Sequence, residues 1–66
     1  MSVLKVIELL ANSDKSWEDA AQNAVSQAAK SVKNIRSVYV QEQSASVKDG
    51  EISDFRVNVK ITFEVK

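Results

Sequence analysis

The sequence predicts an α+β fold in which one helix packs on a three-stranded antiparallel sheet, with the elements in the order β-α-β-β. Three observations lead to this fold class. Residues 55–66 alternate apolar and polar side chains without a break, which is typical of a strand with one buried face. Residues 17–32 carry apolar side chains at helical spacing. Asp49-Gly50 is a strong signal for a tight β-hairpin turn.

The first apolar segment, residues 3–10, is predicted to be a strand that is apolar on both faces. One face would carry Val3, Ile7 and Leu9, and the other Leu4, Val6 and Leu10. A strand that is apolar on both sides is normally covered on both sides. Because one helix covers only one side, this strand predicts contact with a neighbouring subunit.

A helix is predicted from about Ser16 to Lys33. Ser16 reads as the N-cap, and Asp19 three residues later completes a capping-box arrangement. Lys30 and Lys33 would lie near the helix C-terminus, where the dipole favours positive charge, and Asn34 can adopt a left-handed cap conformation. The predicted buried stripe is mostly alanine and comprises Trp17, Ala21, Ala24, Val25, Ala28 and Val32.

The second strand is predicted over residues 36–47 and the third over residues 55–66. Val38 and Val40 share one face of the second strand, whereas its other face carries Ser37, Tyr39, Gln41 and Gln43. Ala45 and Val47 fall on the wrong parity, which predicts a bulge or an edge that meets another subunit. An all-antiparallel sheet places the third strand in the middle, in the order 1-3-2. The helix would cover the apolar face and leave the polar face free.

The length, composition and charge of the chain limit the classes of protein to which it can belong. The 66 residues indicate one domain, residues 1–66, and a lone domain of this size is marginally stable. The chain has no cysteine and no histidine, so partner chains are the expected supplement and we predict a homo-oligomer. A net charge of zero argues against nucleic-acid binding, and no apolar run approaches the ~20 residues of a membrane span. Without a signal-peptide pattern at its start, we expect a cytoplasmic protein.

Candidate functional side chains are few. No nucleophile–base pair, phosphate loop or metal motif occurs, so we expect no enzyme activity. The carboxylates are expected to lie on the solvated surface. Asp49-Gly50-Glu51 lacks the regularly spaced oxygen ligands of a calcium-binding loop. Trp17 could stack on a planar ligand, but packing is the better interpretation. Tyr39 is the better candidate for meeting a ligand or a neighbouring chain. Arg56 could contact a phosphate or carboxylate, or could pair with Glu42 or Glu64 across the sheet.

The chain resembles the dodecin family. The resemblance rests on Lys5-Val6-Ile7-Glu8-Leu9, the Asn12-Ser13 break, Ala20-Ala21 and Ala28-Ala29-Lys30 in the helix, Val40-Gln41-Glu42, and Phe55-Arg56-Val57 through Phe63. It covers nearly the whole chain. It implies a hollow homo-dodecamer of β-α-β-β subunits, a cytoplasmic flavoprotein that stores riboflavin or its phosphate FMN in stacked pairs at subunit interfaces.

The resemblance also implies where a cofactor would bind. The family's flavin-stacking tryptophan falls on Ser37 here, and its flavin-bonding glutamine falls on Arg56. Ser37, Tyr39 and Arg56 are therefore the candidate cofactor-binding residues, on the polar sheet face. Because two departures weaken a standard flavin site, the alternative is a shell that has lost flavin. The segment Ser16-Trp17-Glu18 resembles a subgroup with a calcium-binding member, so the alternative shell would bind calcium or serve a structural role. No metal ligands are assigned.

Overall fold

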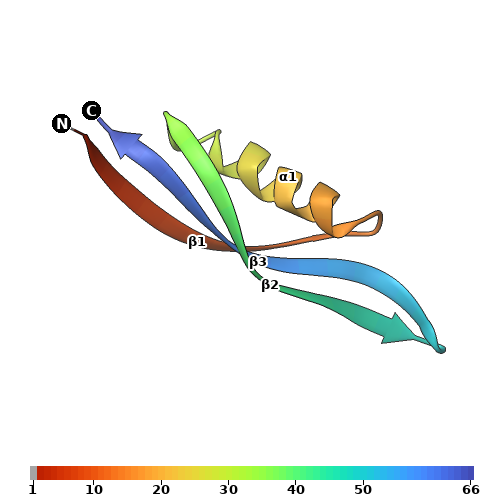
Figure 1. Cartoon of the computed structure of the whole chain (residues 1–66). Helices are drawn as coiled ribbons and strands as arrows, with labels where there is room; N and C mark the ends of the chain where they lie inside the picture. The colour runs from red at the N-terminus through yellow and green to blue at the C-terminus, as the bar shows by residue number, and fades with distance from the viewer. Residues whose placement is uncertain (1) are drawn as a thin grey trace.

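The structure, a computed structural model, describes residues 2–66 and has the predicted order of elements (Figure 1). These are β1 (Val3–Ser13), α1 (Trp17–Ala28), β2 (Ile35–Lys48) and β3 (Glu51–Val65). Both β1 and β2 pair antiparallel with β3, so the sheet order is β1-β3-β2. The prediction that the third strand is central is confirmed.

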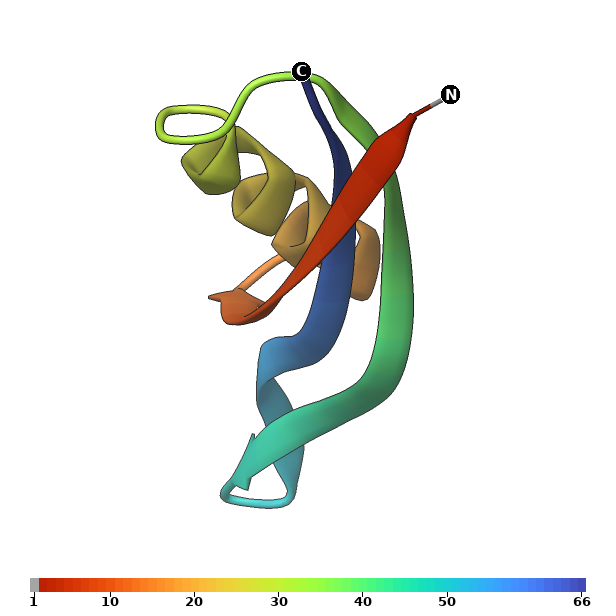
Figure 2. The ribbon, with the colours of Figure 1, turned by 90° about the vertical axis from the view of Figure 1, so that its left-hand side faces the viewer.

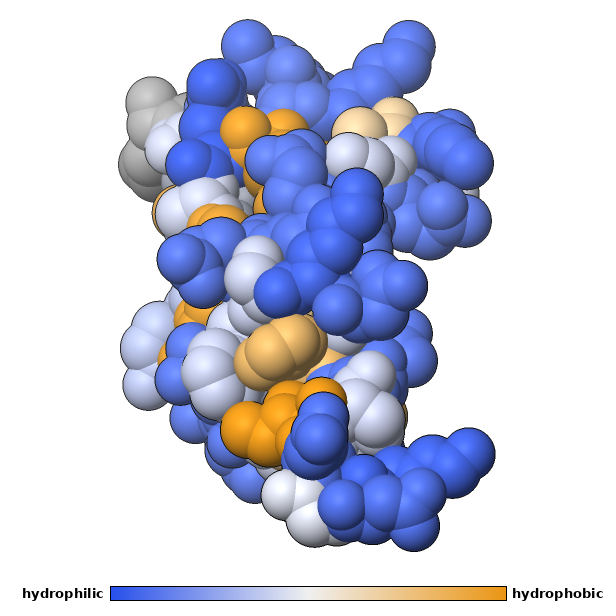
Figure 3. Space-filling model, turned by 90° about the vertical axis from the view of Figure 1, so that its right-hand side faces the viewer, coloured by the Kyte–Doolittle hydropathy of each residue, from blue (hydrophilic) through white to orange (hydrophobic). Residues whose placement is uncertain are grey.

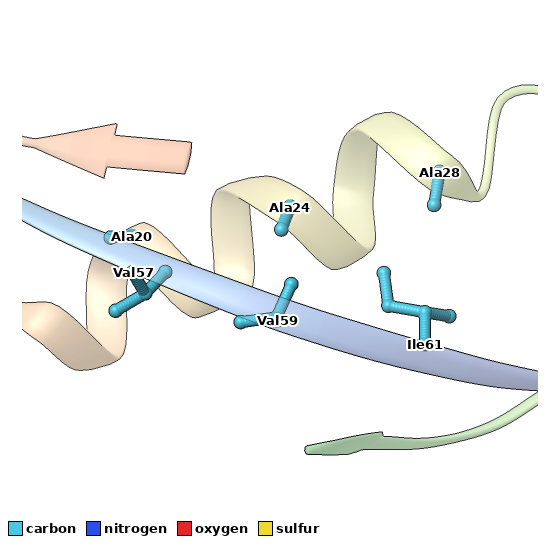
Figure 4. Packing of buried hydrophobic residues seen from close by; sticks show 6 residues of the cluster. All are labelled: Ala20, Ala24, Ala28, Val57, Val59 and Ile61. Atoms are coloured by element: carbon cyan, nitrogen blue, oxygen red, sulfur yellow. The ribbon is translucent and has the colours of Figure 1, made fainter. Parts of the chain in front are cut away.

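Alternation along β3 creates the core. Val57, Val59 and Ile61 point to the helix side of the sheet, where three alanines of α1 lie against them (Figure 4). The alanines are Ala20, Ala24 and Ala28, so Ala20 takes the place predicted for Ala21, which is only half-buried. Small side chains let the helix lie close to the strand. The fully packed core is therefore small.

The entry into α1 follows the predicted cap. The Ser16 hydroxyl accepts a hydrogen bond of 3.0 Å from the Asp19 backbone N–H. The Asp19 carboxylate in turn accepts one of 2.6 Å from the hydroxyl of Ser13, which is buried at the end of β1. This strand is longer than predicted, because Asn12 and Ser13 still pair with β3. The two serines and the aspartate fix the angle between strand and helix.

The predicted helix end was wrong: α1 ends at Ala28, before Lys30 and Lys33. Beyond Ala28 the chain tightens, and the Ser31 N–H donates to the Ala28 carbonyl at 3.0 Å. The helix ends early because β2 must begin at Ile35 to pair with β3. The residues between Ala28 and Ile35 are needed to reverse the direction of the chain. Asn34 has the predicted left-handed conformation, with φ of 64°. Within residues 2–66, no helix has the length and apolarity needed to cross a bilayer.

Trp17 connects α1 to strands β2 and β3. Its indole lies edge-on to Phe55 of β3, with ring centroids 4.9 Å apart, and its Nε1–H donates to the Ser44 carbonyl of β2 at 2.9 Å. It also packs against the buried cluster. The packing role predicted for Trp17 is thus observed.

The β2–β3 hairpin extends past both β1 and α1 (Figures 1 and 2). We call residues 46–54 the hairpin arm; the pairing of β1 with β3 stops at Phe55, the residue that follows the arm in the sequence. Its turn has φ of 53° at Asp49 and 78° at Gly50, two positive values that match a type I′ hairpin. The arm makes the molecule long and narrow, with extents of 51 × 19 × 13 Å.

Apolar side chains of β1 are left uncovered on the side away from the helix. Leu4, Val6 and Leu10 are all exposed, Leu10 by 73%. Their neighbours Ile7 and Leu9 turn to the helix side and pack against the core. The two-faced pattern predicted for the first strand is confirmed, and its second face has no cover within one chain.

Candidate ligand-binding face

The helix-free face of the sheet gathers most of the polar residues on β2 and β3. Side chains alternate between the two sides of each strand, so the pairing register fixes which residues share this face. They comprise Leu4, Val6, Glu8, Leu10 and Asn12 from β1, Arg56, Asn58, Lys60, Thr62 and Glu64 from β3, and Ser37, Tyr39, Glu42, Ser44 and Ser46 from β2. The face has a polar centre along β3 and an apolar margin on β1.

Two of the three predicted site residues lie together. Ser37 is opposite Thr62 and Tyr39 is opposite Lys60, on adjacent strands of this face. The Tyr39 side chain is 63% exposed and Lys60 is exposed beside it. An exposed phenol ring next to an ammonium group offers a flat surface, a hydroxyl and a positive charge to a ligand.

Arg56 lies far from the other two. It is opposite Ser44, six positions along β3 from Thr62, which corresponds to a separation of about 20 Å along the strand. Its guanidinium donates to the Ser46 hydroxyl at 2.9 Å. One subunit therefore does not bring Ser37, Tyr39 and Arg56 into a single site. The predicted pairing of Arg56 with Glu42 or Glu64 is not the one found, because Glu64 forms its ion pair with Arg36.

A β-bulge in β2 changes which residues of this strand lie on the helix-free face. The sequence predicted a bulge but not its position. The register shifts between Val40 and Glu42, so Gln43 moves to the side of Val57 and Glu42 joins the helix-free face. The parity break at Ala45 and Val47 predicted a bulge or an edge that meets another subunit, and of these the bulge is found, with register shifts at Val40/Glu42 and Ser46/Val47. Glu42 is the residue of this face that sequence reasoning missed. It brings a carboxylate opposite Asn58.

Asn58 occupies the centre of the face. It is flanked across the sheet by Leu10 on β1 and Glu42 on β2. Its side-chain oxygen is enclosed, and within residues 2–66 it has no hydrogen-bond partner. A buried acceptor without a donor costs about 1–3 kcal/mol. Because this oxygen has almost no surface open to solvent, the Asn58 side chain would have to rotate before a donor or a cation from outside the chain could reach it.

Acidic groups on this face are spread rather than clustered. Glu8 is opposite Lys60, and Glu42 is opposite Asn58. The Asp54 carboxylate, at the base of the hairpin arm, accepts a hydrogen bond of 3.2 Å from the Asn12 amide. In the part of the chain that the structure describes, no three carboxylates come together as they would in a preformed metal site.

The chain is similar in sequence to known proteins. The sequence model of the Dodecin family matches residues 3–66. The chain is 38% identical to the calcium dodecin of Mycobacterium tuberculosis, over all of this chain and 93% of that protein.

Solved structures share the fold of this chain. The crystal structure of that calcium dodecin, described as calcium-chelating with a novel calcium-binding site, has a TM-score of 0.83 at 39% identity, over 98% of this chain and 93% of that one. A mutant of the Thermus thermophilus dodecin has a TM-score of 0.94 at 23% identity, over 100% of this chain and 98% of that one. The dodecin of Streptomyces coelicolor has a TM-score of 0.92 at 22% identity, over 98% and 93%.

Proposed function

Because the chain belongs to the dodecin family, we propose that it is the subunit of a closed homo-oligomer, a hollow dodecamer, that binds a small ligand where helix-free faces meet. The observation that carries this proposal is the exposed apolar margin of β1, formed by Leu4, Val6 and Leu10. Burying such side chains contributes about 1.5–3 kcal/mol each, and a neighbouring copy would supply that burial. The polar centre lies beside this margin, so a contact between copies would enclose it.

Calcium is the ligand that we place first. The calcium-binding relative matches this chain over its whole length. Calcium takes six to eight oxygen ligands. The helix-free face offers carboxylates on three strands, at Glu8, Glu42 and Asp54. The Asn58 side chain would add its unpartnered oxygen after rotating out of its enclosed position. We propose that oxygens from more than one subunit complete the coordination, so that calcium and assembly stabilise each other.

A flavin is the second candidate, favoured by the exposed ring of Tyr39 beside Lys60. Ser37 offers almost no stacking surface. The Arg56 guanidinium only donates hydrogen bonds, whereas the amide of a glutamine both donates and accepts. We therefore propose that any binding of riboflavin or FMN by this chain is weak, and that storage of flavin is not its main role.

One set of measurements tests both proposals. Light scattering at micromolar subunit concentration should give the mass of a dodecamer, and a monomeric mass would refute the assembly. Calorimetric titration of the chelator-treated protein with calcium should show saturable binding. Asn58→Leu, which keeps the size but removes the oxygen, should weaken that binding, whereas Ser26→Ala on the exposed side of α1 should not. Calcium binding that is unchanged in Asn58→Leu would place the ion elsewhere.

The flavin proposal is tested by quenching of riboflavin emission. Ser37→Trp together with Arg56→Gln should raise the affinity about fivefold or more, because a stacked aromatic contributes roughly 1 kcal/mol beyond its buried area. Arg56→Gln alone should change little. Wild-type protein that already binds riboflavin as tightly as the double variant would mean that the flavin site is built around Tyr39 or lies elsewhere.

A further inference from the structure

The net charge of zero conceals a separation of charge along the molecule. Five of the nine basic side chains lie at the end where the two termini, the end of α1 and the start of β2 meet (Figure 1). We call this group the basic end; it comprises Lys5, Lys30, Lys33, Arg36 and Lys66. Glu64 is the acidic side chain among them, and it is already paired with Arg36.

The opposite half of the molecule is acidic. It consists of the approach to α1, the first turn of α1 and the hairpin arm with the first residues after it. Six of the nine acidic side chains lie there: Asp14, Glu18, Asp19, Asp49, Glu51 and Asp54. The basic side chains in this half are Lys15, Lys48 and Arg56. The long axis of the molecule thus has a positive end and a negative end.

The hairpin arm carries an apolar pair that its own chain does not cover. Val47 is opposite Ile52, and their side chains are 67% and 54% exposed. Figure 3 views the molecule from the side of the hairpin tip and shows an apolar patch close to that end within a hydrophilic surface. Asp49 and Glu51 flank the pair at the tip. The arm therefore presents an apolar centre with a mostly acidic tip.

The basic end has the complementary features. A hollow of about 480 Å³ opens there between the segment after α1 and the end of β3. Its walls include the apolar side chains of Val32, Phe63 and Val65. Lys33 and Lys66 also line it, as does Glu64, whose carboxylate is paired with Arg36. The hollow therefore combines apolar walls with exposed positive charge.

We infer that the acidic hairpin arm of one copy docks in the hollow at the basic end of the next copy. A chain cannot make this contact with itself, because Ile52 and Phe63 are eleven residues apart on one extended strand, about 36 Å. The contact is head-to-tail, and repeated head-to-tail contacts close into rings when the rotation between copies permits. This inference rests on the proposed homo-oligomer and names a surface by which it would assemble.

Charge reversal at each end, alone and combined, tests the contact. Lys33→Glu would place an acidic arm against a less basic hollow, and Glu51→Lys would place a less acidic arm against a basic hollow. Each should raise the subunit concentration for half-assembly roughly threefold or more, and this effect should shrink in high salt. The combined variant Lys33→Glu/Glu51→Lys restores opposite charges and should return toward the wild-type concentration. Lys15→Glu, which makes the same charge change as Lys33→Glu but in the acidic half, should not weaken assembly.

A second measurement addresses the apolar pair. Ile52→Thr keeps a β-branched side chain on the strand but removes apolar surface, and should weaken assembly without changing the circular dichroism of the subunit. Wild-type protein that assembles while both reversals behave like Lys15→Glu, with no recovery in the combined variant, would overturn this inference and leave the proposed oligomer standing. Loss of assembly in Lys33→Glu but not in Glu51→Lys would mean that the hollow receives something other than the arm. A monomeric wild type would overturn both.

Discussion

Trp17 should act as a clamp between α1 and the base of the hairpin arm. It contacts both strands of the hairpin, through the ring of Phe55 on β3 and the carbonyl of Ser44 on β2. Complete burial of a tryptophan makes Trp→Ala cost about 3–5 kcal/mol. Trp17 is half-buried, so we expect Trp17→Ala to lower the free energy of unfolding by about 2–3 kcal/mol.

Trp17→Phe separates the two contacts. A phenyl ring can still meet Phe55 edge-on, but it lacks the N–H that donates to the Ser44 carbonyl. Because Ser44 is exposed and water can replace that donor, we expect a loss of only about 1 kcal/mol. Trp17→Ala additionally loses the aromatic pair, which contributes about 0.5–1.5 kcal/mol beyond its buried area.

The assay is chemical denaturation followed by far-ultraviolet circular dichroism. All variants are compared at one subunit concentration, since an oligomer's apparent stability depends on concentration. Ser26→Ala, an exposed position on the same helix, is the control and should stay within about 0.5 kcal/mol of wild type. Trp17→Ala that unfolds within that margin would refute the clamp.

Three further predictions concern stability, each obtained from the same unfolding measurement. Ile61 is fully buried, so Ile61→Ala should cost about 2–5 kcal/mol and Ile61→Val only about 0.5–1.5, and equal losses would contradict the packing. Ser16→Ala removes the acceptor for the Asp19 N–H and should cost about 1 kcal/mol, whereas an unchanged midpoint would show that the cap is dispensable. Gly50 has φ of 78° with open space around it, so Gly50→Ala should cost about 1 kcal/mol by backbone strain alone, and Gly50→Asn should cost less.

The parts of the fold predicted correctly are those fixed by local chemistry. The alternation from Phe55 onward, the Asp49-Gly50 turn and the Ser16 cap each depend on a few neighbouring residues, and each is found in the structure. The helix end was missed because residues 29–33 have no strong breaker, and the start of β2 decides where the helix must stop. The bulge was expected but not located, since the run from Gln41 to Ser44 is polar throughout and gives no apolar phase to follow.

For the candidate site, the sequence predicts which residues share a face but not which of them lie close together. Sequence alternation places Ser37, Tyr39 and Arg56 on one face, and the register confirms that placement. Whether they meet depends on the pairing between strands, and β3 separates Arg56 from Thr62, the partner of Ser37, by about 20 Å. Two residues fixed on one extended strand cannot approach each other by side-chain motion. A site that uses both Ser37 and Arg56 must therefore take them from different copies.

Binding and assembly are then linked by mass action. A ligand held between copies stabilises the oligomer by an amount that rises with the logarithm of its free concentration, and it gives a separated subunit almost nothing. Calcium at one hundred times its dissociation constant would add about 2.7 kcal/mol per site. The subunit concentration for half-assembly, measured with and without calcium and with and without riboflavin, should consequently identify the ligand even before its contacting residues are located. A ligand that binds and leaves this concentration unchanged would lie within one subunit, contrary to the geometry of the helix-free face.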